Sequence, residues 1–161
     1  MNCRIRPALP EDIPIVGTLF REYQAHLNTD ICFQTFEHEL SGLPGDYAPP
    51  RGAILLAEVD GQVAGVGALR ALDPYTAEMK RVFVRPAFQG RGLGRDMAEG
   101  LIEVAASRGY SKVRLDTLPT LDAAIALYRK LGFLEIDRYN DNPVPGVLFF
   151  ELDLATYPRL S

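Results

Sequence analysis

The stretch that decides the fold is Val82-Phe83-Val84-Arg85-Pro86-Ala87-Phe88-Gln89-Gly90-Arg91-Gly92-Leu93-Gly94-Arg95, in which a glycine-rich turn follows an apolar run. Apolar residues then recur at helical spacing from about 93 to 107, so the pattern predicts a strand that passes through the turn directly into a helix. Alternate glycines leave backbone N–H groups unshielded at the start of that helix, and such groups bind phosphate. The stretch therefore predicts an anion cradle, to which Arg91 and Arg95 add charge. Its glycines are also compatible with a tight turn that binds nothing.

Two better-known phosphate-binding loops do not fit this stretch. A Walker A loop ends in Gly-Lys-Ser/Thr, which is absent. A dinucleotide-binding loop has the pattern GxGxxG, but Arg95 lies three residues after Gly92, and Met97 lies three residues after Gly94. The spacing therefore argues against both classes of nucleotide-binding protein.

The rest of the chain predicts a mixed sheet. Apolar runs at 53–59 and 62–69 flank Asp60-Gly61, a dipeptide typical of a two-residue hairpin turn. Further strands are predicted at 3–6, 79–84, 113–116, 133–137 and 147–152, and helices at 10–27, 35–40, 93–107 and 121–131. This order predicts one α/β domain over residues 1–161, with a mostly antiparallel central sheet of about six to seven strands flanked by about four helices.

The amino-acid composition limits the classes of partner that the chain is expected to bind. Apolar residues make up 47% of the 161 residues and charged residues 24%, as expected for a packed core. The 17 Lys and Arg residues are scattered and the net charge is -4, which argues against nucleic-acid or anionic-membrane partners. No segment approaches the roughly 20 apolar residues of a membrane span, and the N-terminus lacks an apolar signal region, so a cytoplasmic protein is expected.

Cysteine and histidine are too few and too dispersed to predict a metal site or a disulfide framework. Cys3 and Cys32 lack CxxC spacing, and the two histidines, His26 and His38, do not form a cluster. We therefore expect no metal and two free thiols.

Two motifs together resemble the GNAT acetyltransferases. Residues 89–94, Gln-Gly-Arg-Gly-Leu-Gly, match the family signature Gln/Arg-x-x-Gly-x-Gly/Ala, which follows a strand that ends in Val-x-Pro. A later helix in the family carries Ala-x-x-Leu-Tyr-x-x-x-Gly-Phe, and this chain has the same residues in the same order, namely Ala124, Leu127, Tyr128, Gly132 and Phe133. The resemblance extends from about Ile5 to Leu154.

The resemblance implies acetyl-CoA as co-substrate and the amine of a small molecule as acceptor. The backbone N–H groups of the cradle would hold the CoA pyrophosphate, and the cradle consists of Gln89, Gly90, Arg91, Gly92, Leu93, Gly94 and Arg95. The strand that contains Val82, Phe83 and Val84 would splay from its neighbour and pair with the pantetheine arm. The N–H of Val82 would face the thioester carbonyl, where negative charge develops during transfer.

Two side chains are expected to move protons. Periodicity alone makes Tyr128 a core residue on the apolar face of its helix. In the family, the matching Tyr lies beside the CoA sulfur and acts as general acid, so the resemblance implies that role for Tyr128. Some members place a general-base Glu at the position of Glu78. The alternative is a solvated carboxylate or an ion-pair partner of Lys80 or Arg81.

The sequence says less about where the acceptor amine binds than about where CoA binds. In this fold the acceptor enters between the first helical region, here about 23–43, and the loop between the last two strands, here 138–146. The expected substrate residues are Tyr23, Tyr139 and Asn140, and Asn142 of the same loop could also bind polar groups. That loop is equally typical of a simple Pro/Asn turn. Many members also contact CoA through an Asn at the position of Leu121, so that contact is lost or moved.

Several alternatives stay open at this point. Asp116 and Asp122 are candidates for substrate or helix-dipole contacts, and Asp122 is also typical of an ordinary acid in a first helical turn. The acceptor could be the amine of a peptide or protein. The chain could also sense acyl-CoA without turnover, and a homodimer is compatible with the sequence.

Overall fold

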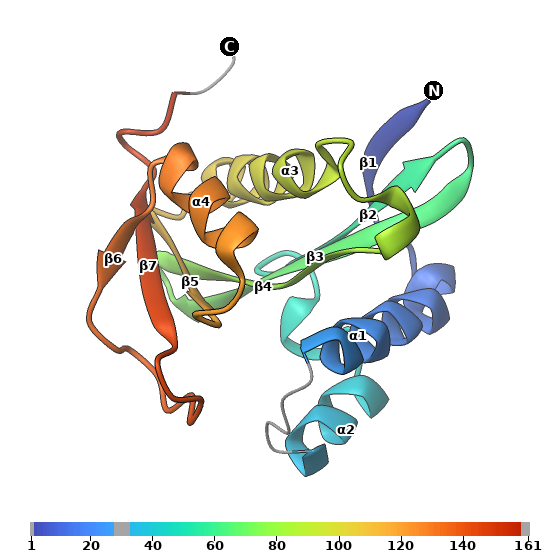
Figure 1. Ribbon diagram of the computed structural model, residues 1–161, viewed down its shortest axis with the longest axis horizontal. Helices are drawn as coiled ribbons and strands as arrows, with labels where there is room; N and C mark the ends of the chain where they lie inside the picture. The colour runs from blue at the N-terminus through green and yellow to red at the C-terminus, as the bar shows by residue number, and fades with distance from the viewer. Residues whose placement is uncertain (1, 28–32, 159–161) are drawn as a thin grey trace.

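The computed structural model describes residues 2–27 and 33–158, which form a sheet with helices on both faces (Figure 1). Within that part of the chain the sheet has seven strands in the order β1-β2-β3-β4-β5-β7-β6. Their bounds are β1 Cys3–Pro7, β2 Ala53–Val59, β3 Gln62–Asp73, β4 Thr76–Val84, β5 Lys112–Thr117, β6 Leu134–Ile136 and β7 Leu148–Asp153. The helices are α1 Ile13–Leu27, α2 Phe33–Ser41, α3 Leu93–Ser107 and α4 Asp122–Leu131. The predicted mixed, mostly antiparallel α/β architecture is confirmed.

Two hairpins build the first half of the sheet. Asp60 and Gly61 have φ values of 50° and 81° and connect β2 to β3, so the predicted two-residue turn is present. A second hairpin joins β3 to β4 where the N–H of Tyr75 donates to Oδ1 of Asp73, at 2.8 Å. Both strands of this second hairpin are longer than predicted, because polar residues such as Arg70 continue the ladder.

The central feature of the sheet is the divergence of β4 and β5. These strands run parallel and pair only from Thr76 and Lys112 to Glu78 and Arg114. Beyond Glu78, β4 has a bulge at Arg81, whose φ is 59°, while β5 continues alongside β7. Residues 79–84 of β4 therefore have no strand partner on the β5 side within the described chain.

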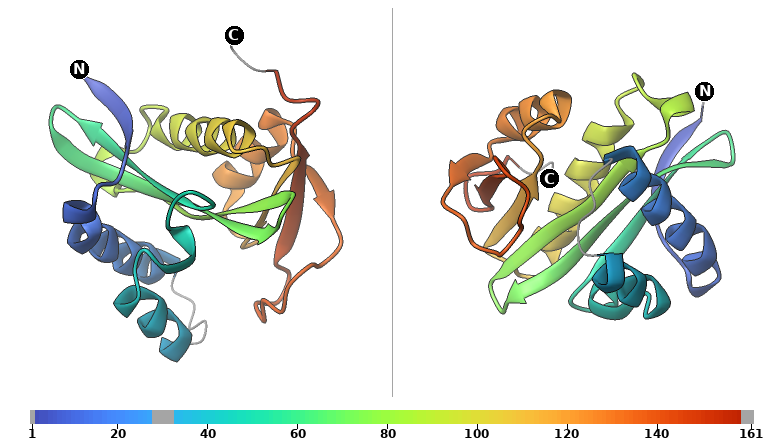
Figure 2. Two further views of the ribbon diagram at one scale, coloured as in Figure 1. Left: turned by 180° about the vertical axis from the view of Figure 1, so that it is seen from behind. Right: turned by 60° about the horizontal axis from the view of Figure 1, so that its bottom comes forward.

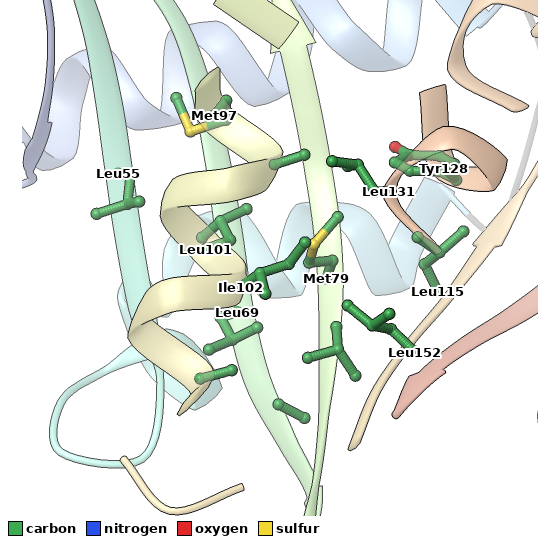
Figure 3. Close-up of a cluster of buried hydrophobic side chains, with 14 of the residues drawn as sticks. Leu55, Leu69, Met79, Met97, Leu101, Ile102, Leu115, Tyr128, Leu131 and Leu152 are labelled. Carbon is green, nitrogen blue, oxygen red and sulfur yellow. The ribbon is translucent and has the colours of Figure 1, made fainter. Parts of the chain in front are cut away.

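Two apolar cores hold the helices in place. One lies between the sheet and the α3 and α4 layer, and Figure 3 shows Met97, Leu101 and Ile102 of α3 in this core, close to Leu69 of β3 and Met79 of β4. The other lies under α1 and α2 on the opposite face, as the two layers in Figure 2 show. These cores fix the start of α3 and the whole of α4 beside the diverging strands.

No helix within residues 2–27 and 33–158 is long and apolar enough to cross a membrane. In the same part of the chain, no group of three or more His, Cys, Asp or Glu side chains could hold a metal ion. Cys3 is an exposed free thiol, and Cys32 lies outside the described residues.

Candidate active site

A cleft of about 630 Å³ opens where β4 and β5 diverge. Its walls come from β4, from the turn into α3 and from α4. Most of the predicted cradle and strand residues line it, namely Val82, Phe83, Val84, Gln89, Gly90, Gly92, Leu93 and Gly94. The structure therefore brings together two segments that the sequence predicted to act on one ligand.

The structure accounts in two different ways for the presence of glycine in the cradle. Gly90 and Gly92 have φ values of 82° and 80°, so the turn itself requires glycine at these positions. Gly94 lies inside the first turn of α3, and a Cβ added there would meet nothing within 4 Å. The tight turn therefore does not account for Gly94, and the space that a side chain would occupy there, in the first turn of α3, is open.

The two arginines of the cradle are not among the residues that line the cleft. The Arg91 guanidinium lies 5.6 Å from the ring centroid of Phe88, and Nε of Arg95 donates to Oε1 of Glu99 at 2.9 Å. Both arginines are exposed. The other five residues of the cradle line the cleft.

A second cavity of about 300 Å³ adjoins the cleft. The two cavities share walls formed by Tyr23, Leu27, Val82, Leu121, Ala124 and Tyr128. Part of the predicted acceptor region, residues 28–32, lies outside the described residues. Tyr23 and Tyr128 thus stand at the junction between the two cavities.

Tyr128 is a buried tyrosine whose hydroxyl group is set apart from the rest of the core. The residue is 8% exposed, and its ring packs edge-on against Phe133 with centroids 5.7 Å apart. Burial, with smaller contributions from Tyr23 and Asp116, raises the pKa of Tyr128. The hydroxyl makes no hydrogen bond to any residue in the described part of the chain, which is unusual for a buried polar group. The hydroxyl thus belongs to a buried residue that lines both cavities.

Side-chain hydrogen bonds connect the loop between β6 and β7 to the end of β5. The side-chain amides of Asn140 and Asn142 donate to Oδ2 of Asp116 at 2.8 and 3.3 Å. Asp116 and Asn142 line the smaller cavity, and Asn140 supports them from outside its wall. The structure thus places the predicted loop at this cavity, with Asn142 rather than Asn140 facing it.

Glu78 is buried, and both of its carboxylate oxygens accept hydrogen bonds. Oε1 accepts from Nε of Arg70 at 2.8 Å, and Oε2 accepts from the hydroxyl of Tyr139 at 2.5 Å. Its side chain is 1% exposed and is not part of either cavity wall. A solvated carboxylate is therefore ruled out, while the role of general base stays a prediction.

One of the two ion-pair partners that the sequence suggested for Glu78 is present, because Nζ of Lys80 lies 3.9 Å from Oε1 of Glu78, whereas Arg81 pairs with Glu39. The sequence did not suggest the nearer partner, Arg70, whose Nε lies 2.8 Å from the same oxygen. The pairing escapes sequence analysis because Arg70 lies on the neighbouring strand, eight residues away. Strand register, which places Arg70 directly opposite Glu78, is the signal that could have found it.

Comparison with known proteins places this geometry in a family. Residues 18–133 match the model of the Acetyltransferase (GNAT) family. This chain is a member of the GNAT acetyltransferase family. The chain is 35% identical to an N-acetyltransferase of Schizosaccharomyces pombe over 91% of each chain. It is also 32% identical to the N-acetylaspartate synthetase of Homo sapiens, over 68% of this chain and 39% of the relative.

Solved structures agree with the family assignment. A putative acyl-CoA N-acyltransferase of Klebsiella pneumoniae is 27% identical and has a TM-score of 0.75, over 94% of this chain and 97% of that one. A putative acetyltransferase of Salmonella typhimurium, solved with its cofactor acetyl-CoA, is 23% identical and has a TM-score of 0.76, over 100% of this chain and 99% of that one. This GNAT chain is thus an acyltransferase by family and by fold.

The burial of Glu78 leads to a stability prediction. Replacing Glu78 by Gln removes the charge that faces Arg70, so we expect the free energy of unfolding to fall by about 1–3 kcal/mol. Urea denaturation measures this change. The matched control is Glu135→Gln, because Glu135 pairs with Arg129 at the surface and should contribute at most about 1 kcal/mol. Equal effects of the two substitutions would contradict a structural role for the Glu78 ion pair.

Proposed function

We propose that this protein transfers the acetyl group of acetyl-CoA directly to a primary amine of a small molecule. CoA occupies the larger cleft and the acceptor occupies the smaller cavity. The observation that carries the proposal is the meeting of the two cavities at Tyr128, beside the unpaired edge of β4. The Salmonella typhimurium relative, which has the same fold and holds acetyl-CoA, supports this choice of donor.

The residues of the larger cleft suit CoA. Open N–H groups at the start of α3, in the segment around Gly94, would hold the pyrophosphate. The unpaired edge of β4 at Val82 and Val84 would hydrogen-bond to the amide groups of the pantetheine arm, as an added strand does. The N–H of Val82 is proposed to stabilise the thioester oxygen as negative charge develops on it.

Proton transfer involves two groups of the chain. As the amine nitrogen bonds to the carbonyl carbon and the carbon–sulfur bond breaks, Tyr128 donates its proton to the sulfur. Burial raises the pKa of Tyr128 and keeps the phenol protonated, which suits it to this role. A carboxylate takes the first proton, which the acceptor ammonium loses before it attacks. The nitrogen loses its second proton as the amide forms, and that proton restores the phenol of Tyr128.

Two carboxylates compete for the role of base. Glu78, which the family resemblance favours, is reached only through Tyr139 or water, because both of its oxygens are already bonded. Asp116 lines the acceptor cavity directly. If Glu78 is the base, Glu78→Gln removes the fall of kcat/KM at low pH while Asp116→Asn keeps it. The reverse pattern would assign the role to Asp116.

A small-molecule acceptor is favoured over a peptide. The acceptor cavity, at about 300 Å³, lies at the lower end of the range for ligand pockets. The human relative is named for the synthesis of N-acetylaspartate, a small molecule. Turnover is favoured over sensing by the unpartnered hydroxyl of Tyr128, which a sensor would not need. We place the protein in the cytoplasm, because an exposed free thiol such as Cys3 suits a reducing compartment.

The first prediction here concerns the cradle. Gly94→Val should abolish acetyl-CoA binding without unfolding the protein, because the new side chain projects into open space in front of the N–H groups of α3. Binding calorimetry and thermal melting with acetyl-CoA, ATP and NAD measure this, and only acetyl-CoA should stabilise the wild type. The stabilisation should be about 2.7 kcal/mol at a hundredfold excess over Kd.

The control for the cradle is Glu103→Val, which introduces the same side chain at an exposed position of α3 away from the cleft. It should keep the wild-type affinity for acetyl-CoA. Unchanged affinity in a folded Gly94→Val variant would contradict the cradle. Stabilisation of the wild type by ATP or NAD but not by acetyl-CoA would contradict the proposed donor.

The second prediction concerns Tyr128. Tyr128→Phe keeps the buried ring, so acetyl-CoA affinity and stability should change little, whereas kcat should fall by about 10²–10⁴-fold. Steady-state kinetics with detection of the released thiol measures kcat. The control is Tyr110→Phe, which removes a hydroxyl that donates to the carbonyl of Arg51 outside both cavities. If Tyr128→Phe kept the full kcat, with acetyl transfer shown to limit the rate, Tyr128 would have a purely structural role in the core.

A further inference from the structure

We infer that the acceptor amine also carries a carboxylate, as an amino acid does, and that Arg70 and Lys80 bind this carboxylate. The inference rests on the proposed function and names the substrate class of the smaller cavity. It starts from the charges of that cavity, whose walls include Glu39, Arg70, Lys80, Arg81 and Asp116.

One cation and both acids of this set are already engaged within the protein. Nε of Arg81 donates to Oε2 of Glu39 at 3.1 Å, and the Arg81 guanidinium lies 4.9 Å from the ring centroid of Phe36. One oxygen of Asp116 accepts the two amide hydrogen bonds from the β6–β7 loop. Arg70 and Lys80 are the remaining charged groups of the wall.

Arg70 and Lys80 keep most of their donors available for a ligand. Arg70 uses Nε on Glu78, and its closest other carboxylate in the described chain is that of Asp46, 3.8 Å away and largely exposed. Nζ of Lys80 is 3.9 Å from Oε1 of Glu78, which is beyond hydrogen-bond range. Neither the two terminal nitrogens of Arg70 nor the ammonium of Lys80 donates a hydrogen bond to a described residue. Their side chains are 32% and 24% exposed, so both are held at the cavity wall.

The hairpin of β3 and β4 places these two cations together. Arg70 stands opposite Glu78, and Lys80 follows Glu78 by two residues, on the same face of the sheet. Both cations approach the same oxygen of Glu78, whose second oxygen is held by Tyr139. One buried acid therefore orients Arg70 through Nε, and the exposed Asp46, at 3.8 Å, is outside hydrogen-bond range of its terminal nitrogens. A planar carboxylate matches the two terminal nitrogens of Arg70, and Lys80 adds a third donor.

The cavity wall also contains a negatively charged side chain, which lies near the place where the amine must react. Asp116 lines the same cavity, close enough to Tyr128 to affect its ionisation. Its carboxylate attracts an acceptor ammonium toward the junction of the two cavities. A zwitterion matches both ends of this arrangement, whereas a polyamine would bring a second cation against Arg70 and Lys80.

The test uses matched acceptors and matched variants. The acceptors are the L-amino acids, their carboxamides, the amines that remain after decarboxylation, and putrescine. The enzymes are the wild type, Lys80→Met and, as control, Lys112→Met, which removes the same charge from a partly exposed residue outside both cavities. Release of free CoA gives kcat and KM. Ligand-observed NMR on the protein, recorded with and without CoA, gives acceptor binding independently of turnover.

We expect an amino acid to be acetylated, and its carboxamide and decarboxylated amine to have kcat/KM lower by about 10–100-fold, chiefly through KM. Lys80→Met should lower kcat/KM for the amino acid by a similar factor of about 10–100-fold and should leave that for its carboxamide nearly unchanged. Lys112→Met should keep the wild-type preference for the carboxylate.

Three results would overturn the inference. The first is a preference of the enzyme for putrescine or the carboxamides, and the second is an equal effect of Lys80→Met on kcat/KM for an amino acid and its carboxamide. The third is the absence of both binding and turnover of any amino acid. Failure of the proposed function is separate, because it appears as absence of acetyl-CoA binding in calorimetry. Acceptor binding by NMR still decides the inference in that case. Binding of an amino acid that is lost in Lys80→Met supports it, and absence of binding overturns it.

Discussion

The parallel pairing of β4 and β5 ends after Glu78 and Arg114, and the rest of the structure depends on this divergence. Had the two strands stayed paired, their backbones would have been hydrogen-bonded to each other and no cleft could open between them. Because they separate, residues 79–84 of β4 present an unpaired edge in the interior of the sheet. An interior edge of this kind is open to an extended ligand, whereas an ordinary edge strand faces solvent.

Charge interactions hold the sheet together where the divergence begins. Arg70, Glu78, Arg114 and Glu151 stand opposite one another on four neighbouring strands, with alternating charge. Nε of Arg70 bonds to Glu78, and Nε of Arg114 bonds to Glu151, each at 2.8 Å. Cross-strand pairs of opposite charge stabilise a sheet, and this row contains the last residue pair of β4 and β5. The row thus fixes the place at which the cleft opens.

Local signals made most of the fold predictable from the sequence. The Asp60-Gly61 turn, the start of α3 at Leu93 and its end before Gly109 depend on residues within a few positions of each other, and all three agree with the structure. The predicted helix at residue 10 begins instead with a short 3-10 turn before α1. Boundaries of this kind depend on a single turn of backbone and vary by a few residues.

Non-local register made the rest unpredictable. The prediction ended one strand at residue 69 and began the next at 79, so Arg70 and Glu78 both fell outside the predicted strands and their pairing was missed. The bulge at Arg81 and the short contact of β4 with β5 also depend on partners distant in the chain. The motif could therefore indicate the loop that we propose for CoA, but not which charges line the smaller cavity.

The central claim is that the unpaired edge of β4 receives the extended arm of CoA. Heteronuclear NMR of the isotope-labelled protein during titration with CoA tests it most directly. We predict that the backbone amide signals of Val82 and Val84 shift saturably, together with those of the first turn of α3. Saturable binding of CoA with shifts at the α3 turn and none across residues 79–84 would contradict the account.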